Sequence, residues 1–222
     1  MKKIFFLSIC LFISSCQKKQ NVNLAKNLYE QSIIEAEDGN LKNALHIINK
    51  SIDMKPNLNS YALKATILYQ LKEYHESLPI FQKIISDKKF SSTLKTDVMN
   101  NYACTLLALD KKHEAKEIWH QLVSDKNYLS PEVAWFNLGL LEFKEGLSNN
   151  LNKTNLEKSK QFFSNAVNIS SEYADAYFYL ALVLFYLNEL ESAKKVTLSL
   201  LGISPEHEAG KALLNKINLK AI

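Results

Sequence analysis

The sequence predicts an all-α protein built from a repeated pair of short helices, and two observations support this prediction. Of its 222 residues, 47% are hydrophobic and 23% are charged, whereas only 5 are glycine and 4 are proline. A chain with ample apolar residues and few helix-breaking ones is expected to form helices around a sizeable core. The second observation is a helical pattern that recurs along the chain, most cleanly over residues 174–205.

Residues 174–205 predict two amphipathic helices separated by a break at residues 188–190. Apolar and small residues at helical spacing mark the two helices, and a proline ends the second; these markers are Tyr177, Leu180, Ala181, Leu184, Ala193, Leu200 and Pro205. Small residues beside large ones let two helices cross closely, and Pro205 cannot continue the helical hydrogen-bond ladder. A helix pair of this kind with a period of about 34 residues matches the tetratricopeptide (TPR) repeat.

Four earlier copies of the unit follow one another from Leu24. Their markers are Leu28, Ser32, Gly39, Ala44, Ile48 and Pro56; Tyr61, Ala65, Leu68, Tyr74, Ser77 and Phe81; Met99, Tyr102, Ala103, Leu106, Ala115 and Trp119; and Trp135, Leu138, Gly139, Ser159, Phe163 and Ala166. After Pro205, residues 206–219 predict a capping helix whose inward side chains are Ala209, Leu213, Leu214 and Ile217. We therefore expect residues 24–222 to form one TPR superhelical solenoid of about five helix pairs plus a C-terminal cap.

Two segments depart from the regular spacing. Residues 147–155, LSNNLNKTN, exceed the repeat by about eight residues and are rich in asparagine, so we expect a loop between the helices of the fourth pair. Such a loop either has no role or contacts a second partner. Residues 87–93 predict a longer polar connection between the second and third pairs.

The N-terminal residues 1–15 have the features of an export signal. Lys2 and Lys3 precede an apolar run, residues 4–13, that is too short to span a bilayer core of roughly 30 Å. The closing tetrad, residues 13–16 (ISSC), resembles a bacterial lipobox, and this resemblance implies cleavage before Cys16 and lipidation of its thiol. The alternative is an ordinary secretory signal with an incidental cysteine.

The residue after the lipidated cysteine affects sorting in lipobox proteins, where an aspartate commonly retains the protein at the inner membrane. Here that residue is Gln17, so the resemblance implies the outer membrane, with the protein facing the periplasm. Residues 16–23 then comprise the lipidated cysteine and a short polar tether. Two or more acyl chains on Cys16 would anchor the protein stably.

Composition and motifs argue against several other functions. The formal net charge of +4 falls to 4 − 2 = +2 without Lys2 and Lys3, too weakly basic for a nucleic-acid surface. Once the signal has left and Cys16 is lipidated, Cys104 is the remaining cysteine, which excludes an intramolecular disulfide and indicates a packing role. The five histidines lack the spacing of a metal site, and the sequence has neither a phosphate-binding loop nor a nucleophile elbow. We therefore expect no enzyme activity, no cofactor, no metal and no small-molecule substrate.

Function should instead lie on the first helix of each pair, which lines the concave groove of a TPR solenoid. In the fourth and fifth copies the groove positions are mostly large and apolar, and the candidate protein-binding residues are Phe136, Leu140, Phe143, Phe178, Leu182, Phe185 and Tyr186. Exposed apolar side chains in such number indicate a groove for a partner helix. The alternative is that the cap helix or the curvature of the fold buries them.

Several residues outside the general TPR pattern resemble a particular family. The run Asn100-Asn101-Tyr102, then Leu106, Glu114-Ala115, Trp119, Tyr128-Leu129-Ser130-Pro131 and Asn137-Leu138-Gly139 is similar to the type IV pilus biogenesis lipoproteins called PilF, PilW or Tgl. The resemblance covers residues 24 to about 201. This chain departs from it at Ala103, where the family usually has glycine, in the insertion, and at Leu107 and Leu141, where some members have cysteines.

The resemblance implies a pilotin, an outer-membrane lipoprotein that binds the secretin subunit of the type IV pilus and promotes its localisation and multimerisation. A general periplasmic TPR scaffold for envelope or peptidoglycan enzymes is the alternative, because its groove would look the same. A cytosolic-type chaperone adaptor is a third possibility, against which the export signal argues.

Overall fold

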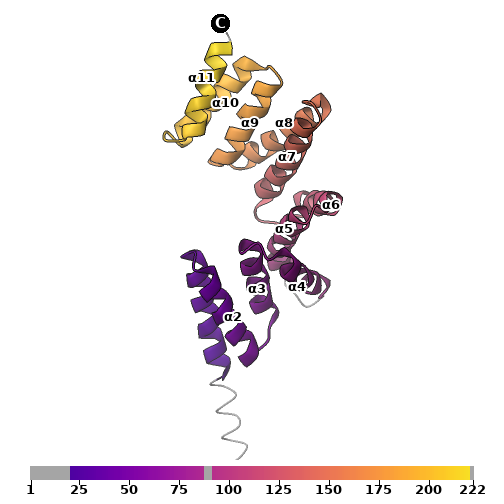
Figure 1. The fold of residues 1–222 in the computed structure, drawn as a ribbon, viewed down its shortest axis with the longest axis vertical. Coiled ribbons are helices and arrows are strands. Elements are labelled where there is room, and N and C mark those ends of the chain that lie inside the picture. The colour runs from indigo at the N-terminus through magenta and orange to yellow at the C-terminus, as the bar shows by residue number, and fades with distance from the viewer. Residues whose placement is uncertain (1–20, 88–91, 221–222) are drawn as a thin grey trace, which may run out of the picture. The chain divides into compact units, whose positions relative to one another are not determined.

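The computed structural model describes residues 21–87 and 92–220, and all regular secondary structure in these residues is helical (Figure 1). The predicted signal, Cys16 and part of the predicted 87–93 connection lie outside the described residues. Residues 21–37 are helical, so the last three residues of the predicted tether, Asn21, Val22 and Asn23, belong to the first helix.

Eleven helices follow one another in the described residues, as five successive pairs and a final single helix. After the helix of residues 21–37 come α2 (Leu41–Met54), α3 (Leu58–Gln70), α4 (Tyr74–Ser86), α5 (Ser92–Ala108), α6 (Lys112–Ser124), α7 (Pro131–Ser148), α8 (Lys153–Ile169), α9 (Ala174–Tyr186), α10 (Leu190–Ile203) and α11 (Glu208–Lys220). The prediction of a solenoid of five helix pairs with a cap is confirmed. The chain divides into two compact units, one up to Asp110 and one from Lys111 onward.

The turns inside the pairs share one backbone feature. Gly39, Lys72, Asp110 and Asn188 all have positive φ, between 60° and 80°, directly after the first helix of a pair. A residue in this left-handed region ends a helix. Gly39 adopts this conformation without a steric cost, whereas the other three are tolerated single residues.

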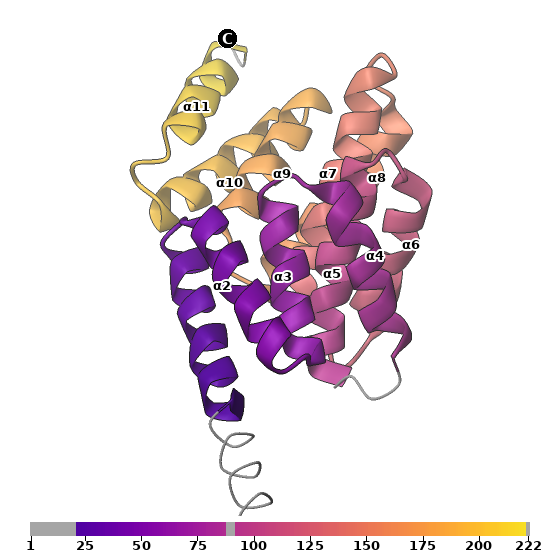
Figure 2. The same cartoon turned by 60° about the horizontal axis from the view of Figure 1, so that its bottom comes forward.

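In the first unit the core follows the predicted markers. Ala44 and Ile48 of α2 are fully buried and pack with Ile67 of α3, while Ala65 and Phe81 hold α3 against α4. Ser32 is also fully buried, and its hydroxyl donates to the carbonyl of Ala44 at 2.9 Å. Figure 2 shows the helices of this unit from a second side.

In the second unit α7 and α8 cross closely at Gly139. A Cβ atom added at Gly139 would lie 2.6 Å from the ring of Phe163, which is fully buried. The hydroxyl of Ser159 donates to the carbonyl of Gly139 at 2.9 Å. The crossing favours glycine, because any added side chain would displace the buried Phe163 ring.

The predicted loop over residues 147–155 is in the right place but too long, because it comprises only residues 149–152. α7 and α8 are 18 and 17 residues long, compared with 13 for α9, and only residues 149–152 lie between them. The extra residues lengthen both helices because Gly146 lets Leu156 approach and the side chain of Asn152 caps α8 by accepting from the Asn155 amide at 3.2 Å. Asn150 and Leu151, both with positive φ, make the turn.

The final helix packs as a cap, in a different rotation from the expected one. Leu213 and Ile217 are buried as predicted, but Ala209 is exposed and Gly210 is buried in its place. A Cβ atom at Gly210 would lie 2.8 Å from Leu200, so α11 approaches α10 closely along its Gly210 side. Figure 1 shows α11 beside α10.

We expect Gly139→Ala to lower the free energy of unfolding by about 1–2 kcal/mol, because overpacking against Phe163 outweighs the gain in helix propensity. Gly202→Ala is the matched control, since nothing lies within 4 Å of its added Cβ and alanine should stabilise the helix by up to about 1 kcal/mol. Urea denaturation followed by circular dichroism measures both. Equal effects of the two substitutions would contradict the close crossing.

Candidate protein-binding site

The predicted groove residues lie on α7 and α9, which contact each other in the second unit. Their aromatic rings form a connected row together with Tyr179: Phe136 and Phe143 lie 5.7 and 5.9 Å from the Tyr179 ring, and Tyr186 lies 5.8 Å from Phe143. We call these four side chains, with Leu140 and Leu182, the aromatic face. The i, i+7 spacing of each aromatic pair places its two rings on one side of its helix.

The side chains of the aromatic face differ in their exposure to solvent. Phe143 is only 5% exposed and belongs to the core, so it supports the face from beneath and offers little surface to a partner. Phe136, Leu140 and Leu182 are half-buried and pack against the same core. Tyr186 is 39% exposed, which makes it the most accessible aromatic ring of the row.

The two other predicted groove residues, Phe178 and Phe185, contact the cap. The Phe178 ring lies 5.1 Å from the imidazole of His207, and the ammonium of Lys220 lies 4.8 Å above the Phe185 ring. His207 also caps α11, because its Nδ1 accepts from the Gly210 amide at 3.0 Å. These two phenylalanines therefore help to hold α11 in place, and the alternative of coverage by the cap describes them better than an open groove.

Sequence reasoning missed Tyr179, the ring that connects the row. It left this residue out because Tyr179 falls between the standard groove positions of the TPR helix. The spacing of seven residues between Tyr179 and Tyr186, equal to that between Phe136 and Phe143, is the signal that would have identified it.

A buried charge also lies in this unit and was missed. Glu142 is fully buried and pairs with the ammonium of Lys116 on α6, while its second oxygen accepts from the Asn155 side chain of α8 at 2.8 Å. Glu142 follows Leu138 by four residues, so the helical spacing itself places it on the buried stripe. The carboxylate thus links three helices.

His120 adjoins this network. Partial burial and the nearby Lys116 lower the pKa of its imidazole, and Glu142 opposes that shift. His120 is therefore neutral at pH 7, and its ring contacts Phe162 at 5.9 Å.

The residues that resemble the pilus lipoproteins make structural contacts within the repeats. Asn101 of α5 donates to the hydroxyl of Thr66 at 3.2 Å, and the Tyr102 hydroxyl accepts from Gln82 at 3.3 Å, so both residues join α5 to the preceding pair. Tyr128 is 5% exposed, and Pro131 is the first residue of α7, where a missing amide proton costs nothing. These residues shape repeats and do not by themselves form a binding site.

The chemistry of Cys104 fits the packing role that the sequence predicts. Burial raises the pKa of the Cys104 thiol to about 11, a shift that a hydrogen bond with Tyr69 opposes, so the thiol stays protonated at neutral pH and is a poor nucleophile.

In the described part of the chain, His, Cys, Asp and Glu form no group of three that could hold a metal ion. Within residues 21–87 and 92–220, no helix has both the length and the apolar character needed to cross a membrane.

Comparison with known proteins identifies the fold of this chain. No protein-family model and no curated protein matches the sequence. Solved structures do match: PilF of Pseudomonas aeruginosa, at 14% identity over 90% of this chain and 91% of that one, has a TM-score of 0.71. The fold is that of a tetratricopeptide-repeat protein.

Two further structures agree with this assignment. PilW, described as a widely conserved type IV pilus biogenesis factor, matches with a TM-score of 0.70 at 15% identity, over 89% of this chain and 91% of that one. The C-terminal part of a TPR repeat-containing protein from Cytophaga hutchinsonii matches with a TM-score of 0.67 at 16% identity, over 87% and 71%. At 14 to 16% identity, these likenesses show the fold.

We expect Glu142→Ala to lower the free energy of unfolding by about 2 kcal/mol, because it leaves Lys116 and Asn155 without their shared partner. Glu172→Ala, at an exposed position, is the control and should change stability by less than about 0.5 kcal/mol. The denaturation midpoint measures both. An unchanged midpoint for Glu142→Ala would mean that the three-helix link contributes nothing.

Proposed function

We propose that this protein binds the secretin subunit of a type IV pilus and, from a lipid anchor in the outer membrane, promotes the localisation and multimerisation of that subunit. The observation that carries the proposal is the likeness of the whole repeat array to PilF and PilW, which spans about nine tenths of each chain with TM-scores of 0.71 and 0.70. The lipobox-like tetrad before Gln17 and the motifs at Asn100–Tyr102 and Tyr128–Pro131 support it.

The aromatic face supplies the recognition surface in this proposal. An amphipathic helix of the secretin would lay its apolar side on Leu140, Leu182 and Tyr186, which are accessible yet backed by the core. Phe143 beneath them keeps the surface rigid, so little side-chain entropy is lost on binding.

The lipid on Cys16 supplies location. The chain from Cys16 to Asn21, the first described helical residue, can span at most about 18 Å, which would keep the first helix near the membrane. Binding and anchoring are thus assigned to separate parts of the chain and can be tested separately.

Affinity purification of the tagged full-length lipoprotein from its own membranes, followed by mass spectrometry, tests the partner. We expect recovery of a secretin with the native chain and at least about ten-fold less with Tyr186→Ser, because the most accessible aromatic ring of the face is lost. Leu198→Ser, at a residue 52% exposed on α10, is the control and should retain the secretin. Circular dichroism confirms that both variants are folded.

Two outcomes would overturn this proposal. Recovery of cell-wall enzymes without a secretin would favour the general periplasmic scaffold. Recovery of a secretin that is unaffected by Tyr186→Ser would keep the partner and reject the aromatic face.

Cys16→Ser should leave secretin binding unchanged but move the protein, and the secretin with it, out of the outer-membrane fraction, because the acyl chains are lost. Fractionation of membranes with immunoblotting measures both proteins. Gln17→Asn, which keeps the cysteine, is the control. Unchanged outer-membrane fractionation of Cys16→Ser would show that another feature anchors the protein.

A further inference from the structure

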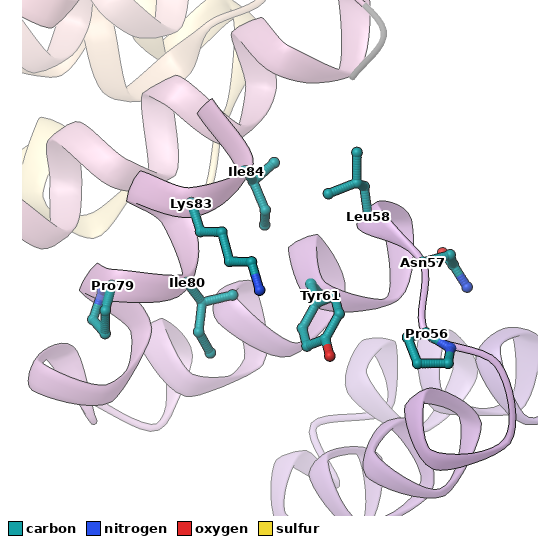
Figure 3. A pocket seen from close by; sticks show the side chains of 8 residues that line it. All are labelled: Pro56, Asn57, Leu58, Tyr61, Pro79, Ile80, Lys83 and Ile84. Carbon is teal, nitrogen blue, oxygen red and sulfur yellow. The ribbon is translucent and has the colours of Figure 1, made fainter. Parts of the chain in front are cut away.

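A concave site lies in the first unit, on helices that carry no part of the aromatic face. A cavity of about 480 Å³ is bounded by the start of α3 and the C-terminal half of α4. Figure 3 shows the side chains around it, which are mostly apolar: Pro56, Asn57, Leu58, Tyr61, Pro79, Ile80, Lys83 and Ile84. A volume of this size accommodates more than one side chain of a ligand.

The walls of this cavity are held in place by the core. Ile84 is 1% exposed and belongs to the core cluster of α3, α4 and α5, and Leu58, Tyr61 and Ile80 pack against that cluster. Pro56 precedes α3, and Pro79 lies within α4, where its ring restricts the backbone. The cavity is therefore preformed, and a ligand would not have to order it.

Comparison with the fourth repeat shows why the cavity is present in the second. Counted from the buried markers Ala65 and Gly139, Tyr61 corresponds to Trp135; counted from Ser77 and Ser159, Ile80 corresponds to Phe162. In the fourth repeat the rings of Trp135 and Phe162 contact each other at 5.5 Å. In the second repeat a tyrosine and an isoleucine occupy these positions, and they leave space between the helices.

Lys83, a cation, is the charged residue among those that line the cavity. The ammonium of Lys83 lies 5.7 Å from the centre of the Tyr61 ring and extends over the cavity in Figure 3. Within the described residues, no carboxylate lies within ion-pairing distance of it. The other polar wall, Asn57, is already engaged: its side chain accepts from the Ser60 amide at 2.9 Å and donates to the Ser60 hydroxyl at 2.8 Å.

From the apolar walls and the single cation, we infer that this cavity binds a peptide segment of a partner protein that carries a bulky apolar side chain next to a carboxylate. The apolar side chain fills the space between Tyr61, Ile80 and Ile84, and the carboxylate pairs with Lys83 at the rim. A peptide fits because the cavity is larger than one side chain and its cation stands beside the apolar space. The inference does not depend on the proposed secretin partner.

Nuclear magnetic resonance of the full-length chain, labelled at isoleucine methyl groups, tests this with two probes, N-acetyl-Phe-Asp-amide and its isostere N-acetyl-Phe-Asn-amide. We expect the Asp peptide to shift the Ile80 and Ile84 signals saturably, with a Kd on the order of 1 mM. The Asn peptide should bind roughly two- to five-fold more weakly, because it lacks the ion pair.

Two lysine substitutions provide the matched comparison. Lys83→Gln should remove the preference for the Asp peptide, whereas Lys42→Gln, at an exposed lysine of α2, should retain it. Both residues are exposed, so neither change should disturb folding. Absence of saturable shifts at Ile80 and Ile84, or equal affinity of the native chain for the two peptides, would overturn the inference.

Discussion

The structure depends on close crossings between the helices of each pair. A short two-helix unit cannot bury its apolar surface alone, and it becomes stable only when its helices approach closely enough to interlock and then stack on neighbours. Ala44, Ala65, Gly139 and Ala193 are the small residues at these crossings, and each alanine among them is fully buried. Large side chains such as Phe81 and Phe163 fill the space that the small ones leave.

The fourth repeat shows how this constraint tolerates an insertion. The added residues continue α7 and α8 along the axes that Gly139 has already set, with Gly146 as a second point of close approach to Leu156. Glu142, between these two glycines, is reached by Lys116 and Asn155. The ion pair and the hydrogen bond offset the cost of burying the Glu142 carboxylate. They also connect the lengthened pair to α6, so the inserted residues are part of the packed unit.

The sequence was sufficient for the fold because the markers of helix packing are local and periodic. Small and large residues at helical spacing identified every helix pair, and Gly39 and Asn188 identified two of the turns. It was insufficient where the outcome depends on a contact distant in sequence. Asparagines predicted a loop over all of residues 147–155, yet only residues 149–152 form it, and the partners at the start of α8 include Glu142, which no local pattern connects to Asn155.

The structure of the candidate binding surface could be predicted only in part, for a related reason. Positions within the repeat indicated which side chains of α7 and α9 point away from their own helix pair, but they did not indicate which residues cover those side chains. Phe143 lies beneath Tyr179 and Tyr186, and Phe178 and Phe185 lie against His207 and Lys220 of the cap region. Whether an apolar side chain is core or surface therefore depended on the neighbouring helix, which is α9 for Phe143 and the cap for Phe178 and Phe185.

Repeats built on one plan can nevertheless present different chemistry, because only the crossing positions are constrained by packing. At one such variable place the fourth repeat is closed by Trp135 and Phe162, and the second is open between Tyr61 and Ile80 with Lys83 beside it. The aromatic face of α7 and α9 is neutral and graded from core to surface, whereas the cavity of α3 and α4 is apolar with a cation. Under the proposal made above, an apolar helix would suit the first surface, and it would leave the Lys83 ammonium of the second without a counter-charge. If both proposals hold, the segments that bind the two surfaces therefore differ in charge as well as in shape.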